Sequence, residues 1–388
     1  QIVDDNSLVE NQTFLDWCLQ YDELPEATQY SVQYLLENAE TNDCHEAAQI
    51  LETQSSLRKT STSIQGDFRP FSSLTEVAEI DTRLAVEDSP RIDFNPLGNL
   101  PNLAVFKIHG KIHDLSPFSV LQDLEELKII SFRSSTGDPK LSNLSPLASL
   151  SNIRKLYISV PHEAINDLTP LSELFNLEEL TIPAQNIYDL RPLSNLANLN
   201  YLSLERNPIQ NLSPLKNLSF LTELTFSHNN VSNLSPLENL HRLSSLSFSH
   251  TQISDLAPLS HLDKLTTILA LANDISNLDP LRSLYHLEVI EFSENRISDL
   301  APLADLTQLE VIGLSKNNIS DLTPLANLVQ LSFLSLDGNP ISDLSPLSGL
   351  TNLERLVLPN DPDLDISPLD SLIQQGNLQI RRGRCGRC

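Results

Sequence analysis

The sequence predicts an α/β repeat solenoid, in which short strands alternate with short helical turns, and three observations support this fold class. From Pro170 to Pro368, a proline recurs every 22 residues without a slip. Apolar residues recur at fixed places within each unit, and an Asp or Asn usually stands three residues before the proline. A fixed period of this size is typical of a stack of near-identical coils rather than of one closed globule.

Each unit begins with a segment that we expect to form a short strand. In the unit that begins at Leu331, Leu334 and Leu336 fall on one side of an extended chain. Ser335 and Asp337 then point to the other side. A strand of about three to five residues cannot bury its apolar face alone. Neighbouring units should therefore stack into a parallel sheet with the leucines inside and short polar side chains outside.

The second half of each unit is expected to form a turn. Asn339 follows the strand, and a buried Asn side chain can bond backbone groups that are left free where the chain leaves the sheet. Asp343 then opens an Asp-Leu-x-Pro-Leu segment, in which Asp caps a helical turn and Pro is tolerated near its start. The few residues available predict a 3-10 turn, so the sheet should be concave and the turns convex. The Asn position holds Asn207, Asn229, Asn273, Asn295, Asn317 and Asn339, with Gln185, Thr251 and Asp361 as substitutes.

Residues 1–66 do not follow the repeat, and we expect an N-terminal α-helical cap and a connector there. Thr13 and Asp16 form a capping-box variant at the start of one helix. Pro25 opens a second helix that should run to about Ala39. A cap is reasonable at this point because the first coil would otherwise expose a sheet edge and an open core.

Two cysteines of the cap, Cys18 and Cys44, lie in separate predicted helices, the later one spanning about residues 43–52. A disulfide between them would staple a piece too small to have a core of its own. The alternative is a pair of reduced core cysteines. Residues 53–66 are rich in Ser and Thr and are expected to form a loose connector.

We divide the chain into the cap and connector at 1–66, a solenoid of about 13–14 coils at 67–372, and a basic tail at 373–388. The tail contains Cys385 and Cys388. An isolated C-x-x-C is a weak signal, because a zinc site needs four ligands and a redox site normally lies on a βαβ fold. We expect a disordered tail whose cysteines can pair locally or between molecules.

The repeat resembles the leucine-rich repeat family, specifically the 22-residue repeats of the bacterial internalins. The resemblance covers roughly residues 68–372, where strand leucines, Asn and Asp-Leu-x-Pro-Leu coincide. It implies a right-handed solenoid that binds partners on its concave face. Residues 1–66 resemble the helical segment that precedes such repeats in secreted bacterial proteins. Before Pro170 the spacing loosens, and an insert near 131–138 is either drift in a tolerant loop or a partner-contact loop.

The net charge of −26 restricts the classes of partner. Nucleic-acid binding needs a basic footprint, so we expect no nucleic-acid partner, and the acidic charge favours basic ones. Residues 1–66 alone hold 12 acidic and 2 basic residues, a net charge of −10. No apolar run of about 18 residues occurs, which predicts no membrane span. Gln1 in place of Met, followed by a polar stretch, predicts a processed protein that is secreted, on the cell surface or periplasmic.

The sequence contains no motif that carries catalytic chemistry. It has no phosphate-binding glycine loop, no H-E-x-x-H and no G-x-S-x-G, so we expect no enzyme activity and no cofactor. His228 and His250 share a repeat position one coil apart, but no third metal ligand is evident. The run from Asp361 to Asp365 lacks the Gly and the distant Glu of a calcium loop. We therefore expect no metal site.

Function should then lie on the outward strand positions. Most of these are small and polar, but Val289, Val311 and Phe333 break the pattern on three consecutive coils, next to Leu269 and Leu271. An apolar stripe across a polar face is typical of a contact surface, and the alternative is β-propensity alone. The candidate partner-binding residues are Tyr201, Leu269, Leu271, Val289, Glu291, Val311, Phe333, Arg355 and Val357.

These features predict a non-enzymatic module that binds a protein, because a rigid sheet orders its contact residues before the partner arrives. A structural subunit of an extracellular or surface assembly, which associates with itself, is the alternative, since no cap is evident after Leu372. Polysaccharide binding ranks third, because Tyr201 and Phe333 lie six coils apart. The expected polar rim consists of Glu291, Asp337, Arg355 and Lys316.

Overall fold

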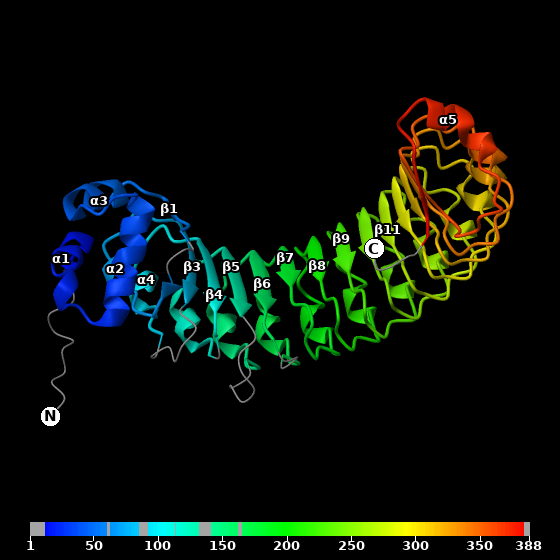
Figure 1. The fold of residues 1–388 in the computed structure, drawn as a ribbon. Coiled ribbons are helices and arrows are strands. Elements are labelled where there is room, and N and C mark those ends of the chain that lie inside the picture. Colours follow the sequence, from blue (N-terminus) through cyan, green and yellow to red (C-terminus); the bar gives the residue numbers. More distant parts are fainter. Residues whose placement is uncertain are drawn as a thin grey trace. The chain divides into compact units, whose positions relative to one another are not determined.

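The chain folds into two compact units, Gln1–Asn186 (unit 1) and Ile187–Cys388 (unit 2). Their stacked coils carry parallel strands on one side and short helical turns on the other (Figure 1). The alternation follows from the repeat, in which a short apolar strand is followed by a turn-forming segment. The computed structural model describes residues 12–59, 63–84, 92–112, 114–131, 141–161 and 165–383.

Unit 1 begins with the three helices expected from the sequence. They are α1 (Phe14–Leu19), α2 (Glu26–Ala39) and α3 (Cys44–Leu51). The capping box is confirmed, because the Thr13 amide donates to the Asp16 carboxylate at 2.8 Å and the Asp16 amide donates to Thr13 Oγ1. These hydrogen bonds satisfy amides that the first turn of α1 leaves without a helical partner.

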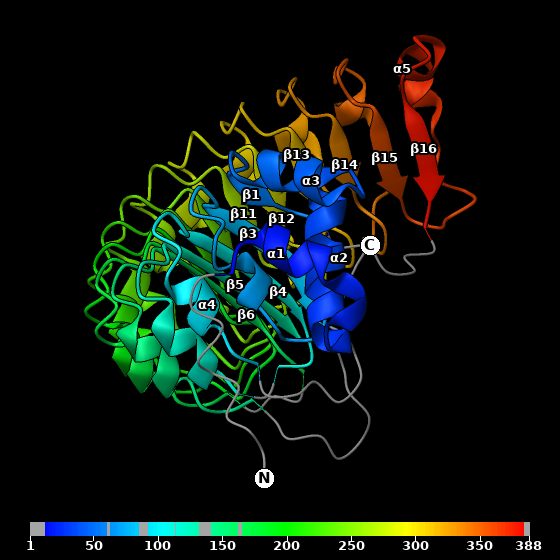
Figure 2. The ribbon, with the colours of Figure 1, turned by 90° about the vertical axis from the view of Figure 1, so that its left-hand side faces the viewer.

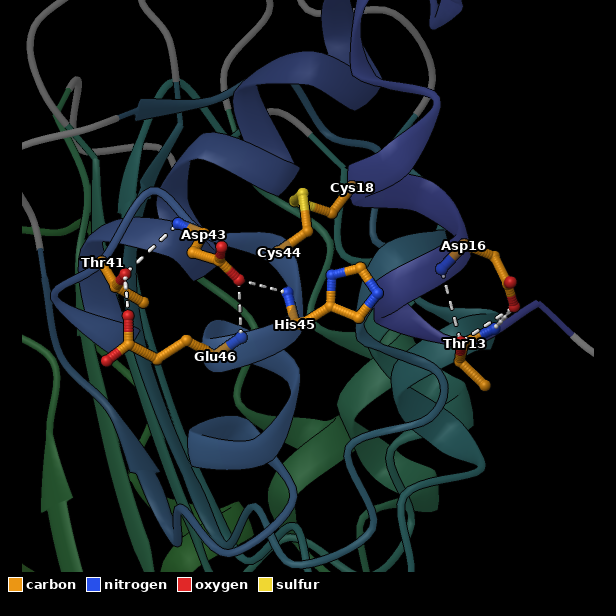
Figure 3. Close-up of a disulfide and its surroundings, with 8 residues drawn as sticks. All are labelled: Thr13, Asp16, Cys18, Thr41, Asp43, Cys44, His45 and Glu46. Carbon is orange, nitrogen blue, oxygen red and sulfur yellow. Dashed lines mark hydrogen bonds between the residues drawn. A yellow bond between two sulfur atoms is a disulfide. The ribbon is translucent and has the colours of Figure 1, made fainter.

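The predicted disulfide between Cys18 and Cys44 is present, with the two Cα atoms 5.7 Å apart. It joins α1 to the first residue of α3, next to the Asp43 side chain that caps α3 (Figure 3). The Asp43 carboxylate accepts hydrogen bonds from the His45 and Glu46 amides, both at 2.9 Å. A covalent bond thus holds together a cap that has little core of its own.

Helix α2 joins the cap to the first coils of unit 1. Thr28 donates to the Asp67 carboxylate, and the Tyr34 hydroxyl donates to the Asp81 carbonyl at 2.9 Å. The buried ring of Tyr34 also stacks on Phe71, with ring centroids 5.8 Å apart. The cap therefore covers the open core of the first coil, as expected.

The strands of unit 1 form a parallel sheet. β1 and β2 lie in the segment expected to be a loose connector, yet both pair with β3. Beyond β3 the strands follow in chain order. A single turn of α-helix, α4 (Asn95–Gly98), replaces a 3-10 turn in one coil. The strands are β1 (Ser56–Leu57), β2 (Ser63–Ile64), β3 (Glu79–Leu84), β4 (Val105–Gly110), β5 (Glu126–Ser131), β6 (Lys155–Ser159) and β7 (Glu179–Thr181).

The strands of unit 2 also stack in chain order, each paired in parallel with the next. The inward residues of the strands from Tyr201–Ser203 to Arg355–Leu358 are fully buried, as with Ile312 and Leu314, while Val311 is half-buried on the opposite face. This is the alternation that the repeat predicts. The strands are β8 (Tyr201–Ser203), β9 (Glu223–Thr225), β10 (Ser245–Ser247), β11 (Thr267–Leu269), β12 (Val289–Glu291), β13 (Val311–Gly313), β14 (Phe333–Ser335), β15 (Arg355–Leu358) and β16 (Gln379–Arg382).

The recurrent Asn forms a buried ladder that links successive coils. Asn295 Nδ2 donates to the carbonyls of Phe292 (3.0 Å) and Ala270 (2.9 Å), the latter in the preceding coil. Asn295 Oδ1 accepts from the Ile275 amide at 3.0 Å. Asn273, Asn317 and Asn339 repeat this arrangement. The predicted role of this residue is therefore confirmed.

The Asp that opens each turn accepts a hydrogen bond from the first residue of a 3-10 turn. In one coil, the Thr323 amide donates to Asp321 Oδ1 at 2.8 Å, and the turn spans Thr323–Leu325. Side-chain and backbone hydrogen bonds from Thr323 hold the pKa of Asp321 below its ordinary value. Asp321, whose side chain caps the turn, lies one position before Leu322, the N-cap by backbone geometry. The predicted 3-10 conformation is confirmed.

Unit 2 ends in structure that the sequence analysis did not anticipate. In place of a disordered tail after Leu372, α5 (Asp370–Gln374) is followed by β16, which pairs with β15 (Figure 2). Gly376 makes the connecting turn possible, because its φ of 83° suits a residue without a Cβ. β16 lacks the leucines of the repeat, which is why periodicity could not predict it.

Two sequence predictions fall on residues outside the described ranges. They concern the cysteines Cys385 and Cys388, and the insert, of which residues 132–138 are not described. Within the ranges that are described, the helices are too short or too polar to cross a membrane.

Candidate partner-binding face

The outward residues that precede the buried leucines form one continuous row across unit 2. The register pairs Val289 on β12 with Val311 on β13, then Phe333 on β14, then Arg355 on β15. The three apolar side chains are half-buried, whereas the inward neighbour Ile312 is fully buried. The row therefore faces outward, as the sequence pattern predicted.

A second row runs parallel to the first and adds apolar side chains at both ends. It pairs Leu269 with Glu291, then Gly313, then Ser335, then Val357. Small residues occupy its middle, so the sheet surface carries little side-chain bulk there. We use the name apolar patch for the half-buried residues Leu269, Leu271, Val289, Val311, Phe333 and Val357.

Tyr201 does not belong to this patch. It lies on β8, and β9, β10 and β11 separate that strand from β12. Its direct neighbour is Glu223 on β9 rather than an apolar residue. The sequence placed Tyr201 on the correct face, but the strand order sets it apart from the patch.

Larger exposed apolar side chains lie elsewhere in unit 2, and sequence reasoning overlooked them. Phe220 is 47% exposed, Tyr285 58% and Val329 46%. Each follows a 3-10 turn, at a place that is usually polar in other coils, which is the signal that could have revealed it. These residues occur on coils that are not adjacent, and single exposed apolar residues are ordinary. The apolar patch differs because its members are contiguous.

Glu291 lies within the apolar patch, between Leu269 and Gly313 in the second row. Its side chain extends over β13, and its carboxylate occupies the space that a Cβ on Gly313 would take. Glu291 Oε1 accepts a hydrogen bond from the Ser293 amide at 2.8 Å. The absence of a side chain at residue 313 thus allows a half-buried carboxylate to lie across the sheet beside Val311.

The two cations of the expected rim are already engaged. Lys316 Nζ forms an ion pair with Glu294 at 2.6 Å. The Arg355 guanidinium lies 5.7 Å from the centroid of the Phe333 ring, in cation–π geometry. The carboxylate of Asp337 fills the place that a Cβ on Gly383 would occupy. Within the expected rim, both cations thus already have partners in the chain, whereas the carboxylates of Glu291 and Asp337 form no ion pair among the described residues.

His228 and His250 stack closely, with ring centroids 4.2 Å apart and an interplanar angle of 13°. Partial burial lowers the pKa of His228, and the charges of His250 and Arg206 lower it further. Across the described part of the chain, no three or more His, Cys, Asp or Glu side chains gather as a metal site would require. Asp361 and Asp365 instead accept hydrogen bonds from backbone amides of their own turns.

Taken together, the parallel strands, the Asn ladder and the 3-10 turns define a leucine-rich repeat solenoid. A family model described as leucine-rich repeats in two copies matches residues 219–261 and 285–327. The chain therefore carries leucine-rich repeats, preceded by an N-terminal helical segment, and it is similar in structure to internalins.

Solved structures extend the similarity to most of the chain. An internalin (InlF) from Listeria monocytogenes is 27% identical, with a TM-score of 0.70 over 92% of this chain and 95% of that chain. The functional domain of InlJ from the same organism is 22% identical, with a TM-score of 0.66 over 95% and 80%. The plant peptide hormone receptor RGFR1, in complex with RGF2, is 18% identical, with a TM-score of 0.58 over 85% and 68%. No curated protein sequence matches the chain. A leucine-rich repeat fold supports a role in protein binding.

Proposed function

We propose that the chain is a non-enzymatic protein-binding module that recognises its partner through the sheet face of unit 2. The observation that carries this proposal is the apolar patch, whose members lie on adjacent strands. Val289, Val311 and Phe333 occupy one register row, and the remaining members border it. A contiguous apolar surface on an otherwise polar face is typical of a contact site.

The scaffold favours binding because it fixes the patch before a partner arrives. The strands are held by ladders of backbone hydrogen bonds and by the Asn ladder behind them, so few groups lose freedom on association. Phe333 and Arg355 lie in cation–π contact, and both residue types are enriched at protein interfaces, Arg also among the side chains that dominate binding energy. We expect this pair to be the main anchor.

The compartment belongs to the same proposal. A disulfide between Cys18 and Cys44 persists in an oxidising environment, so we place the protein outside the reducing cytosol, on a cell surface or secreted. RGFR1, a receptor with this fold, was solved with RGF2 bound. That precedent supports a protein or peptide as the ligand. No observation favours the self-associating scaffold or polysaccharide binding, and neither is proposed.

The test compares two double variants of the whole chain. Val311→Glu with Phe333→Asp alters the apolar patch, whereas Phe220→Asp with Tyr285→Glu removes exposed apolar side chains outside it. Proteins captured from cell-surface extracts by the unaltered chain are identified and purified, and their affinities are measured for all three forms. We expect the patch variant alone to bind at least about tenfold more weakly. Equal losses in both variants, or a loss only in the control, would place the binding site elsewhere.

A further inference from the structure

The carboxylates on the sheet face of unit 2 lack positive partners. Glu205, Glu223, Glu291 and Asp337 all occupy outward positions of its coils. Within the described residues, none of these four takes part in an ion pair, although ion pairs occur elsewhere in unit 2. These four carboxylates are therefore not neutralised by ion pairs within the described part of the chain.

Glu291 is the member of this group whose position has the largest energetic consequence. It is half-buried, it adjoins Val289 and Val311, and only one backbone amide is hydrogen-bonded to its carboxylate among the described residues. A partner that covers the apolar patch must also cover this carboxylate. Removing an unpaired carboxylate from water costs several kcal/mol, so an apolar or acidic cover would oppose binding.

A cation from the partner would reverse that cost. A lysine or arginine that reaches Glu291 would form a charge-assisted hydrogen bond in a site that the surrounding apolar contacts shield from water. A second copy of this chain is a poor source of such a group, because its net charge is −26 and its own face presents carboxylates. The complementary occupant is a basic, apolar segment of another protein.

Resting on the proposed function, we propose that the partner inserts a lysine or arginine side chain against Glu291, with apolar side chains on either side that cover Val311 and Phe333. The recognised chemistry is thus a cation flanked by apolar groups, in an extended segment that runs across β12, β13 and β14. Gly313 is the positioning residue, because its missing side chain leaves room for the carboxylate.

The probe is a displayed library of random peptides of about a dozen residues, panned on the full chain. Counter-selection on the Val311→Glu, Phe333→Asp variant removes peptides that bind elsewhere. Peptides that survive are synthesised, and their affinities are measured by fluorescence anisotropy. We expect them to share a Lys or Arg beside apolar residues. Replacing that cation with norleucine should weaken binding about tenfold.

Variants of the chain then test the residue assignment. Glu291→Gln retains an acceptor for the Ser293 amide and should weaken the selected peptides about tenfold, with no further loss when the peptide's cation is also removed. Glu310→Gln is the matched control, because this exposed carboxylate adjoins Val311 in sequence. Its effect should stay below about twofold. Gly313→Ala keeps the charge but displaces it, and should reproduce part of the Glu291→Gln loss.

The outcomes separate the two proposals. Patch-dependent peptides that lack a cation, or that bind Glu291→Gln as tightly as the unaltered chain, would overturn this inference and leave the proposed function standing. A library that yields no patch-dependent peptide would overturn both. Selection of acidic residues on a Glu291→Lys variant, in place of basic ones, would support the inference independently.

Discussion

The sheet faces of the two units differ in how their carboxylates are balanced. In unit 1, Lys107 Nζ lies 3.0 Å from Glu79 and 3.3 Å from Glu126, so one cation bridges carboxylates from both neighbouring strands. Lys155 pairs with Glu179 at 2.6 Å further along. In unit 2, the outward carboxylates have no such partners among the described residues, and an apolar patch lies among them.

This contrast shows that one scaffold can present opposite kinds of surface. Inward apolar residues and parallel backbone pairing occur in both units, so the difference in charge balance resides in the outward residues. A face whose charges are already paired gains little from a charged partner. A face with unpaired charges beside apolar side chains gains more, provided that the partner complements it. The comparison therefore favours unit 2 as the place of the proposed recognition.

The largest expected effect comes from the Asn ladder of unit 2, whose place among the described residues of unit 1 is taken by Gln185 in the last coil. Asn295→Leu would leave the buried Ile275 amide without a partner and remove one of the two side-chain donors from each of the Ala270 and Phe292 carbonyls. We expect a loss of about 4 kcal/mol in the free energy of unfolding. Asn295→Thr should cost less, since Thr251 fills the equivalent position. Urea unfolding measures both, and equal losses would contradict this role.

The next effect concerns unit 1. Replacing Cys18 and Cys44 with Ala opens a loop that spans a sequence separation of 26 residues. We expect a loss of about 3 kcal/mol, because the unfolded chain regains conformational freedom. Hydrogen exchange followed by mass spectrometry should show faster exchange in α1 and α3, with the strands of unit 2 unchanged as the internal control. Faster exchange in β12–β14 would show that the disulfide of unit 1 also affects the stability of unit 2.

A smaller effect tests the paired charges directly. Lys107→Met would leave Glu126 without this ion pair and Glu79 with Arg58 as its remaining cation, and both carboxylates are mostly buried. We expect a loss of about 1 to 2 kcal/mol in the unfolding free energy. Lys155→Met is the matched control, with a more exposed pair and a loss of at most about 0.5 kcal/mol. If the two variants lose the same amount, burial does not set the strength of these pairs.

The smallest effect is the pH dependence that Glu79 contributes in unit 1. Burial alone would raise the pKa of Glu79, but hydrogen bonds and charges from Lys107 and Arg58 outweigh it and hold the pKa below its ordinary value. The folded state therefore binds this proton less readily than the unfolded state. Its contribution to stability is present above about pH 4.3, the ordinary value for Glu, and is lost as the pH falls through the lower folded value.

Urea midpoints measured between about pH 6 and pH 3 test this dependence. Lys107→Met should make the decline with acid shallower, because one cause of the lowered pKa is gone. A decline of unchanged steepness would show that Glu79 does not contribute.

The parts of the molecule that sequence could predict are those set by short-range rules. The capping box at Thr13, the ladder represented by Asn295 and the outward row from Val289 to Phe333 each follow from spacing along the chain. A 22-residue period fixes which residue lies beside which, so the rows could be written down before any coordinates. The disulfide followed from two cysteines in a small cap.

The remaining features depend on where side chains turn once the coils are stacked. Sequence reasoning placed Lys316 and Glu291 together in one polar rim, but Lys316 pairs with Glu294 and Glu291 extends over Gly313. Each outcome depends on which residue stands 22 positions away, on the neighbouring coil. Strand order likewise separated Tyr201 from the patch, since the residues between them are polar. β16 carries no repeat pattern and could not be found by periodicity.

The uniform register of β12–β14 also governs how such a chain can diverge. Gain of one complete coil between β13 and β14 would keep every leucine turned inward, yet move Phe333 one strand spacing, about 4.8 Å, further from Val311. Duplication would therefore change the distance between two anchors in fixed increments, whereas point mutation changes their chemistry at constant distance. In such a solenoid, the spacing of the contact residues and their chemistry can therefore evolve separately.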